Sequence, residues 1–146
     1  MNIDTVENPR SPAKVVLDTN TIISGIGFRG NPRKILDLAL EGDVKPVISP
    51  ILLAELEDVV TKKFPKLKGD LDLINKKIKK KFDIVKPAKS LDVVRDDDDN
   101  RVLEAAVEGK CDYIVTGDRD LLDFKKYKKI KIVKPADFLK LFETEN

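Results

Sequence analysis

The chain has 146 residues, of which 41% are hydrophobic and 37% are charged, and its formal net charge is +2. It contains one cysteine and no histidine, which excludes an internal disulfide, a thiolate metal cluster and every nucleophile that depends on a histidine base. Hydrolytic chemistry would therefore have to use carboxylates, lysines or a bound metal ion.

The sequence shows no pattern typical of a signal peptide and no apolar run long enough to span a bilayer, so we expect neither a leader nor a membrane span. The single Cys111 fits a reducing compartment and is expected to be a buried free thiol. We therefore expect a cytoplasmic protein that does not contact a membrane. Abundant Lys and Glu, with no Gln or Trp, favour a heat-adapted source, a thermophile.

Predicted strands and helices alternate along the chain. Residues 1–13 are polar and contain two prolines, which predicts a flexible lead-in. The run KVVLD predicts a buried strand that ends at Asp18. After a glycine-rich turn, residues 31–43 predict a helix with Asn31 as its cap and Pro32 at its first position.

The middle of the chain continues this pattern. Residues 44–49 predict a second strand, and residues 49–64 a helix capped by Ser49. Residues 69–82 predict a helix with one apolar stripe and lysines on its remaining surface, and residues 82–87 are compatible with a short strand.

The last third supplies two more helices and two more strands. Residues 96–110 predict a helix that ends at Gly109, residues 112–116 and 129–133 predict strands, and residues 135–142 a closing helix. This alternation predicts a three-layer α/β/α fold with a central parallel sheet of four to five strands. We expect one domain over residues 14–142 and a short tail over residues 143–146.

Two aspartates follow predicted strands, Asp18 after KVVL and Asp118 after DYIVTG. The ordinary role of such a residue is to form a turn or to cap a helix. Alternatively, the two belong to a ligand site, because ligands of open parallel sheets bind beyond the carboxyl ends of the strands.

Two more carboxylates fall on apolar helix faces. Helical spacing places Glu55 on the core-facing stripe, although it could also lie at the edge of the stripe and reach water or a lysine. The same spacing turns Asp99 inward, leaves Asp98 facing solvent, and makes Asp96 or Asp97 the helix cap.

Convergence of Asp18, Glu55, Asp99 and Asp118 would raise their pKa values or require a cation. Oxygen ligands suit Mg²⁺ or Mn²⁺ and disfavour zinc. A cation held in this way would acidify a water and stabilise displacement at phosphorus.

The segments that carry these acids are VVLDTNTIISG, SPILLAELEDVV, DDDDNRVLEAAVEGKCDYIVTGDRDLL and KIVKPADFL. In this order they resemble the PIN-domain family of metal-dependent nucleases, over nearly the whole chain. Within the family, the chain is most similar to the VapC-like PIN proteins that are toxin components of toxin–antitoxin pairs.

The resemblance implies that Asp18, Glu55, Asp99 and Asp118 are the catalytic and metal-binding acids. It also implies two additional metal-site acids, Asp96 and Asp120, and two polar residues that orient water or a carboxylate, Asn20 and Thr116. The implied activity is that of an endoribonuclease, which hydrolyses an RNA phosphodiester with a water activated by Mg²⁺ or Mn²⁺. The implied partners are RNA, a second copy in a homodimer and a small antitoxin.

Lysines gather in residues 62–81, and Lys76, Lys77, Lys79 and Lys80 are candidate phosphate-binding residues. The alternative is an ordinary solvated helix face. We find no aromatic platform for stacking bases. The competing hypothesis for the whole protein is a PIN-fold module that binds RNA or a protein partner without cutting.

Overall fold

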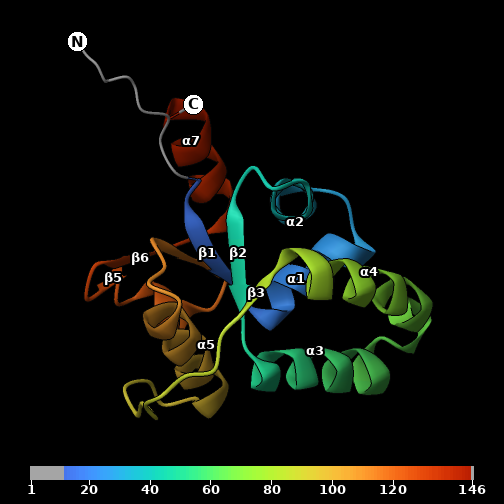
Figure 1. Ribbon diagram of the computed structural model, residues 1–146, viewed down its shortest axis with the longest axis horizontal. Coiled ribbons are helices and arrows are strands. Elements are labelled where there is room, and N and C mark those ends of the chain that lie inside the picture. The colour runs from blue at the N-terminus through green and yellow to red at the C-terminus, as the bar shows by residue number, and fades with distance from the viewer. Residues whose placement is uncertain (1–11, 146) are drawn as a thin grey trace.

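The fold is built on a six-stranded sheet, seen in a computed structural model that describes residues 12–145 (Figure 1). The strand order is β3-β2-β1-β4-β6-β5, and all neighbouring pairs are parallel except β5 with β6. The strands are β1 (Lys14–Leu17), β2 (Lys45–Ile48), β3 (Asp83–Ile84), β4 (Tyr113–Val115), β5 (Lys126–Tyr127) and β6 (Ile130–Val133).

Helices flank this sheet (Figure 1). They are α1 (Thr19–Gly27), α2 (Asn31–Glu41), α3 (Pro50–Lys63), α4 (Lys68–Lys81), α5 (Asp97–Glu108), α6 (Arg119–Leu122) and α7 (Pro135–Glu145), with a 3-10 turn at Pro65–Leu67. Helix α5 packs against β1, β2 and β4, whereas α1 and α2 pack against each other and α7 lies beside α2.

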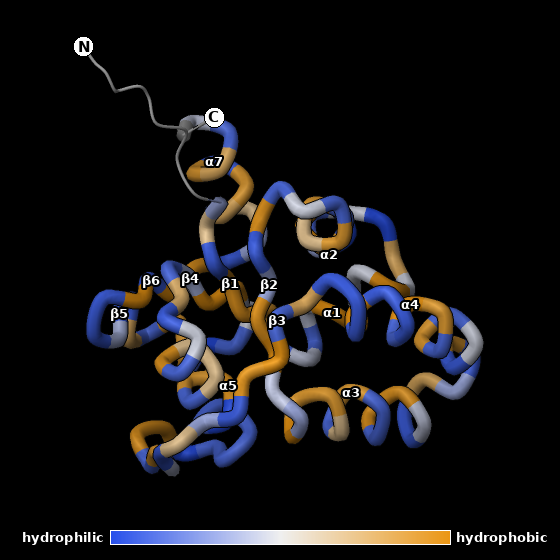
Figure 2. Tube along the Cα trace, viewed as in Figure 1, coloured by the Kyte–Doolittle hydropathy of each residue, from blue (hydrophilic) through white to orange (hydrophobic). Residues whose placement is uncertain are grey.

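The central strands are covered on both faces. Three successive residues of β1, Val15, Val16 and Leu17, are all buried, although neighbouring side chains of a strand point to opposite faces. A parallel sheet buried in this way is the centre of an α/β/α sandwich. In Figure 2 the tubes of α3 and α4 alternate between orange and blue, as expected for helices with one face on the core.

The predicted fold class is confirmed, with one strand more than expected. The additional strand is β5, whose two residues, Lys126 and Tyr127, carry too little apolar pattern to predict a strand. It forms because it pairs with β6 in an antiparallel hairpin. Helix α7 runs to Glu145, so most of the expected tail belongs to this helix.

The glycine-rich turn expected after β1 is in fact helix α1. This helix buries three isoleucines, and Gly25 lets it approach α2 closely, since a Cβ there would lie 3.1 Å from Cδ2 of Leu36. The prediction that Asn31 caps α2 was wrong. Gly30, with a φ of 135°, occupies the N-cap, no side chain caps this helix end, and Asn31 is already helical.

Other local predictions are confirmed. The Ser49 hydroxyl caps α3 by accepting from the Leu52 amide, and the free Cys111 thiol is buried. Residues 1–11 of the predicted lead-in lie outside the described residues. Within residues 12–145, none of the helices has the length and apolar character needed to cross a membrane.

Candidate active site

An acidic pocket of about 110 Å³ lies at the carboxyl edge of the sheet. Its walls are Asp18, Thr19, Asn20, Glu55, Asp96, Asp98, Asp99, Val102 and Asp118. Four acids that are far apart in the sequence are thus brought together as expected, along with Asp96 and Asn20. They come from the end of β1, from α3, from the start of α5 and from the loop after β4.

Asp18 is held in place by two hydrogen bonds. Its Oδ1 accepts from the Thr21 amide at 2.8 Å and so caps α1, while its Oδ2 accepts from the Thr116 hydroxyl. The same Thr116 oxygen accepts from the backbone amide of Asp118 at 2.9 Å. Thr116 is fully buried and therefore fixes the positions of two acids at once.

Two further acids of the pocket are helix caps. The Oδ2 of Asp118 accepts from the Leu121 amide at 3.2 Å, and the Oδ1 of Asp96 accepts from the Asp98 amide at 2.9 Å. Each cap uses one carboxylate oxygen, which leaves the second oxygen for the pocket. The roles of helix cap and pocket acid are therefore combined in the same residues.

Asp99 faces inward, as its helical spacing predicted. It is 8% exposed, and its Oδ2 is buried without a hydrogen-bond partner among the described residues. Burial raises the pKa of Asp99 to about 8, and a hydrogen bond with Asp118 and the charges of Asp118, Asp96 and Asp18 add to the effect. A buried acceptor oxygen without a donor is a position where a cation would be stabilised.

Glu55 is half-buried beside the core stripe of α3. This place is intermediate between the fully core-facing position and the solvent-reaching edge that the sequence allowed. Burial raises the pKa of Glu55 to about 7, with a further contribution from the charge of Asp98, whereas a hydrogen bond with Thr19 acts in the opposite direction. No lysine pairs with Glu55 in the described part of the chain.

Asp98 is the pocket acid that the sequence reasoning missed, along with the pocket residues Thr19 and Val102. It is exposed, as expected, but it lines the pocket and hydrogen-bonds with Glu55. The contact depends on the packing of α5 against α3, which no residue spacing within α5 reveals.

The acids present fit a hard divalent cation. One carboxylate oxygen from each of Asp99, Asp118 and Asp120 lies within 4.8 Å of the other two. All the donors of the pocket are oxygens, which suits Mg²⁺ or Mn²⁺. Asp120 is exposed and stands outside the pocket wall, and Asn20 lies exposed at the rim.

The segment before α5 is fastened to that helix by buried polar groups. The Oδ1 of Asn100 accepts from the amides of Val93 and Val94, both at 2.8 Å, and its Nδ2 donates to the Val94 carbonyl at 2.9 Å. Asn100 is fully buried. Because Asp96 follows two residues after Val94, these bonds set the direction in which the chain reaches the pocket.

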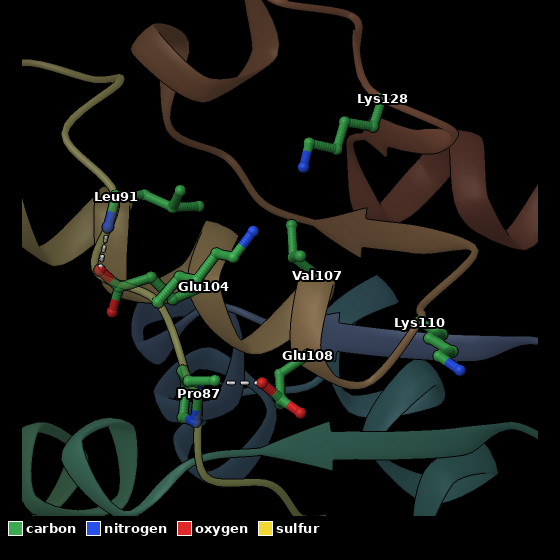
Figure 3. Close-up of a pocket in the computed structure, with 9 residues that line it drawn as sticks. Pro87, Leu91, Glu104, Val107, Glu108, Lys110 and Lys128 are labelled. Atoms are coloured by element: carbon green, nitrogen blue, oxygen red, sulfur yellow. Dashed lines mark hydrogen bonds between the residues drawn. The ribbon is translucent and has the colours of Figure 1, made fainter.

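A second hollow, of about 200 Å³, lies over the outer face of α5 (Figure 3). Its two carboxylates bind backbone amides, with Glu104 accepting from Leu91 at 2.7 Å and Glu108 from Ala88 at 2.9 Å. This hollow shares no residue with the acidic pocket. Its glutamates hold the loop of residues 85–92 against α5.

The candidate phosphate-binding lysines of α4 do not line the acidic pocket. Lys76, Lys77, Lys79 and Lys80 are all exposed. Lys77 lines hollows between α2 and α4, and Lys80 lines a hollow with Lys14 and Lys45 at the amino ends of β1 and β2. That hollow is at the edge of the sheet opposite the acids.

The sequence matches the PIN domain profile over residues 14–120, and the chain belongs to the PIN domain family. An uncharacterized protein of Methanocaldococcus jannaschii, MJ1680, is 39% identical over 104 residues, which is 66% of each chain. The match thus spans just under two thirds of the length of that relative.

Two solved structures share the fold. A chain of VapBC2 from Rickettsia felis, solved with a DNA fragment from its promoter, superposes with a TM-score of 0.57 over 82% of this chain and 96% of its own, at 19% identity. The PIN domain endonuclease Utp24 gives a TM-score of 0.50 over 84% of this chain and 85% of its own, at 20% identity.

Proposed function

We propose that this protein is a metal-dependent endoribonuclease, whose catalytic acids are Asp18, Glu55, Asp99 and Asp118. The observation that carries the proposal is the Oδ2 of Asp99, a buried oxygen without a hydrogen-bond donor, in a pocket walled by other carboxylates. Membership of the PIN domain family and the fold shared with Utp24 support nuclease chemistry.

The residues of the pocket have distinct tasks in this proposal. Asp99 and Asp118 would hold Mg²⁺ or Mn²⁺ with help from Asp120, whose carboxylate lies within reach of both. Thr116 keeps Asp18 and the Asp118 backbone in position, and Asp96 and Asn20 contribute polar groups at the rim. When bound, the cation would supply acidification of a water and neutralisation of the charge that develops on the phosphate.

The remaining assignments are proposals of the same kind. The α4 lysines Lys76, Lys77, Lys79 and Lys80 are candidate phosphate contacts, and their position away from the pocket would restrict them to distant parts of an RNA. We also propose a cytoplasmic toxin that forms a homodimer and is blocked by a small antitoxin. The shared fold with a VapBC2 chain is consistent with that proposal.

Cleavage of a labelled, mixed-sequence single-stranded RNA in the presence of Mg²⁺, Mn²⁺ or EDTA tests this function. We expect metal-dependent cutting by the wild type and none by Asp99→Asn. The matched control is Asp97→Asn, since Asp97 is exposed, belongs to the same aspartate run and does not line the pocket. RNA binding without cleavage under any metal would favour the non-cleaving binding module instead.

A further inference from the structure

The carboxyl edge of the sheet continues past the acids toward β6 and β5. The Thr116 amide donates to the Val133 carbonyl at 3.0 Å, so the last residue of β6 lies beside the residue that positions the acids. Lys134 follows Val133 directly. Because β5 runs antiparallel, the residues that precede it reach the same edge, and the Ile132 amide donates to the Lys125 carbonyl at 2.9 Å.

Phe124 stands at this edge, one turn of helix away from the acidic pocket. Asp118 caps α6 through the Leu121 amide, and the Phe124 amide donates to the Leu121 carbonyl at 3.1 Å where that helix ends. Neighbouring strands are about 4.8 Å apart, so β5 lies roughly 10 Å from β4. Phe124 is therefore on the order of 10 Å from the strand end after which Asp118 stands.

The residues of this edge have the chemistry of a nucleic-acid contact. Phe124 is 39% exposed, and Lys125, Lys126 and Lys134 are exposed lysines without an ion-pair partner among the described residues. We name these four residues the β5 strip. Single-stranded nucleic acids bind to basic grooves that also offer aromatic faces for stacking bases.

A basic surface beside this pocket would favour the binding of RNA. Carboxylates repel the phosphates of an approaching RNA, and lysines nearby would lower that cost. The lysines Lys77 and Lys80 of α4 line hollows on other parts of the molecule. Along the edge that holds the acids, the β5 strip is a basic surface that extends beyond the exposed Arg95 and Arg119, the chain neighbours of Asp96 and Asp118.

An edge strand also carries lysines for another reason, because they prevent pairing with a strand of another molecule. That explanation accounts for Lys126 on β5. It does not account for an exposed phenylalanine, since an apolar aromatic ring at a sheet edge promotes association. Phe124 lies beside three lysines that have no ion-pair partner among the described residues. This combination is expected for RNA binding and not for the protection of a sheet edge.

We infer that the β5 strip binds the single-stranded RNA that flanks the scissile phosphate, with Phe124 stacked on a base and the lysines on neighbouring phosphates. The inference deepens the proposed ribonuclease function and rests on it for the choice of RNA as ligand. It also restricts the substrate, since a base that stacks on a side chain is not paired in a duplex.

Anisotropy of a labelled single-stranded RNA in EDTA measures binding without cleavage. We expect Phe124→Ala to weaken binding about tenfold and Phe124→Tyr to retain it, because stacking on a protein ring is worth about this much for one base. The double variant Lys126→Glu/Lys134→Glu should lower affinity more than tenfold and flatten the salt dependence of binding. A duplex of the same sequence should compete weakly.

Matched controls come from surfaces far from the acids. Phe28→Ala removes an aromatic ring that is 60% exposed at the end of α1, and Lys45→Glu at the amino edge of the sheet makes the same charge change as either lysine substitution of the strip made alone. Thermal unfolding of every variant checks folding. Any of three results would overturn the inference. The strip variants could bind like the wild type, the strip and control variants could weaken binding equally, or the wild type could bind no RNA.

The inference and the proposed function fail separately. A wild type that binds RNA through the β5 strip but never cuts it refutes the nuclease proposal and keeps the strip. A wild type that cuts with Mn²⁺ while Phe124→Ala and the lysine double variant bind and cut normally keeps the nuclease and refutes the strip.

Discussion

Replacing Asp99 with asparagine should stabilise the metal-free protein. The fold raises the pKa of Asp99 from 3.8 to about 8, first through burial and then through a hydrogen bond with Asp118 and the charge of Asp118. The folded chain thus holds a proton that the unfolded chain releases. The stability that this proton confers is present at low pH and is lost as the pH rises through about 8.

The size of the effect follows from the same values. A pH of 7 is about three units above the pKa of this carboxyl in the unfolded chain, and one unit corresponds to about 1.4 kcal/mol. The raised pKa therefore lowers the free energy of unfolding of the wild type by at most about 4 kcal/mol. Relaxation of the neighbouring carboxylates and desolvation of the new amide reduce the gain to about 2 kcal/mol. For a chain of this size, that gain raises Tm by roughly 4 to 8 °C.

Thermal unfolding in EDTA at about pH 5, 7 and 8 is the assay. The advantage of Asp99→Asn over the wild type should widen as the pH rises, and Asp97→Asn should show no such widening. Added Mn²⁺ should then raise the Tm of the wild type and leave that of Asp99→Asn nearly unchanged. An Asp99→Asn protein that is less stable than the wild type at every pH would mean that the carboxylate has a structural role and would refute the reasoning.

Three further predictions concern the supports of the pocket and its cation. Thr116→Val removes the hydroxyl that donates to Asp18 and should lower the free energy of unfolding by about 1–3 kcal/mol in urea titrations; an unchanged midpoint would show that the bond contributes nothing. Asn100→Ala removes three hydrogen bonds, two of them buried, and should cost about 2–4 kcal/mol, with faster amide exchange in the segment before α5 as the specific sign. Calorimetry should find that Mn²⁺ binding releases protons and becomes tighter between about pH 6 and 8. The reason is that Glu55 and Asp99, with raised pKa values of about 7 and about 8, must ionise to bind a cation. Binding heats that do not depend on the ionisation enthalpy of the buffer would contradict this.

The features that the sequence predicted well are those decided by local periodicity. Helical spacing alone turned Asp99 inward and made Asp96 or Asp97 the cap of α5, and the cap is Asp96. Strand runs followed by aspartate placed Asp18 and Asp118 at one edge of the sheet, because parallel strands bring their carboxyl ends together.

The features that were missed depend on contacts between elements. Asp98 reaches Glu55 only because α5 packs against α3. Helix α1 was hidden by its glycines, yet Gly25 allows a close approach of α2, since a Cβ there would lie only 3.1 Å from the Leu36 side chain and the Pro32 carbonyl. Strand β5 has no pattern of its own and exists through its pairing with β6, which is also why Phe124 was not recognised as an exposed residue beside the pocket.

The four consecutive aspartates of residues 96–99 have different roles because a helix begins within them. The Asp96 carboxylate accepts from one free amide at the start of α5, and Asp18 and Asp118 each accept from one amide of α1 and α6. Amides and positive dipole ends of three helices therefore offset part of the negative charge, each by about 0.3–1 kcal/mol. Asp99 lies inside its helix and receives no such amide.

A cation is consequently most needed at Asp99, and this makes Asp99 a better probe of metal chemistry than Asp18. A substitution at Asp18 removes a possible metal ligand, but it also disturbs the cap of α1 and the hydrogen bond with Thr116, so a loss of activity there would have several causes. A substitution at Asp99 changes its hydrogen bond with Asp118 but leaves the caps of α1, α5 and α6 in place. Loss of cleavage and gain of metal-free stability in the same Asp99 variant would thus point to the cation more directly than any effect at Asp18.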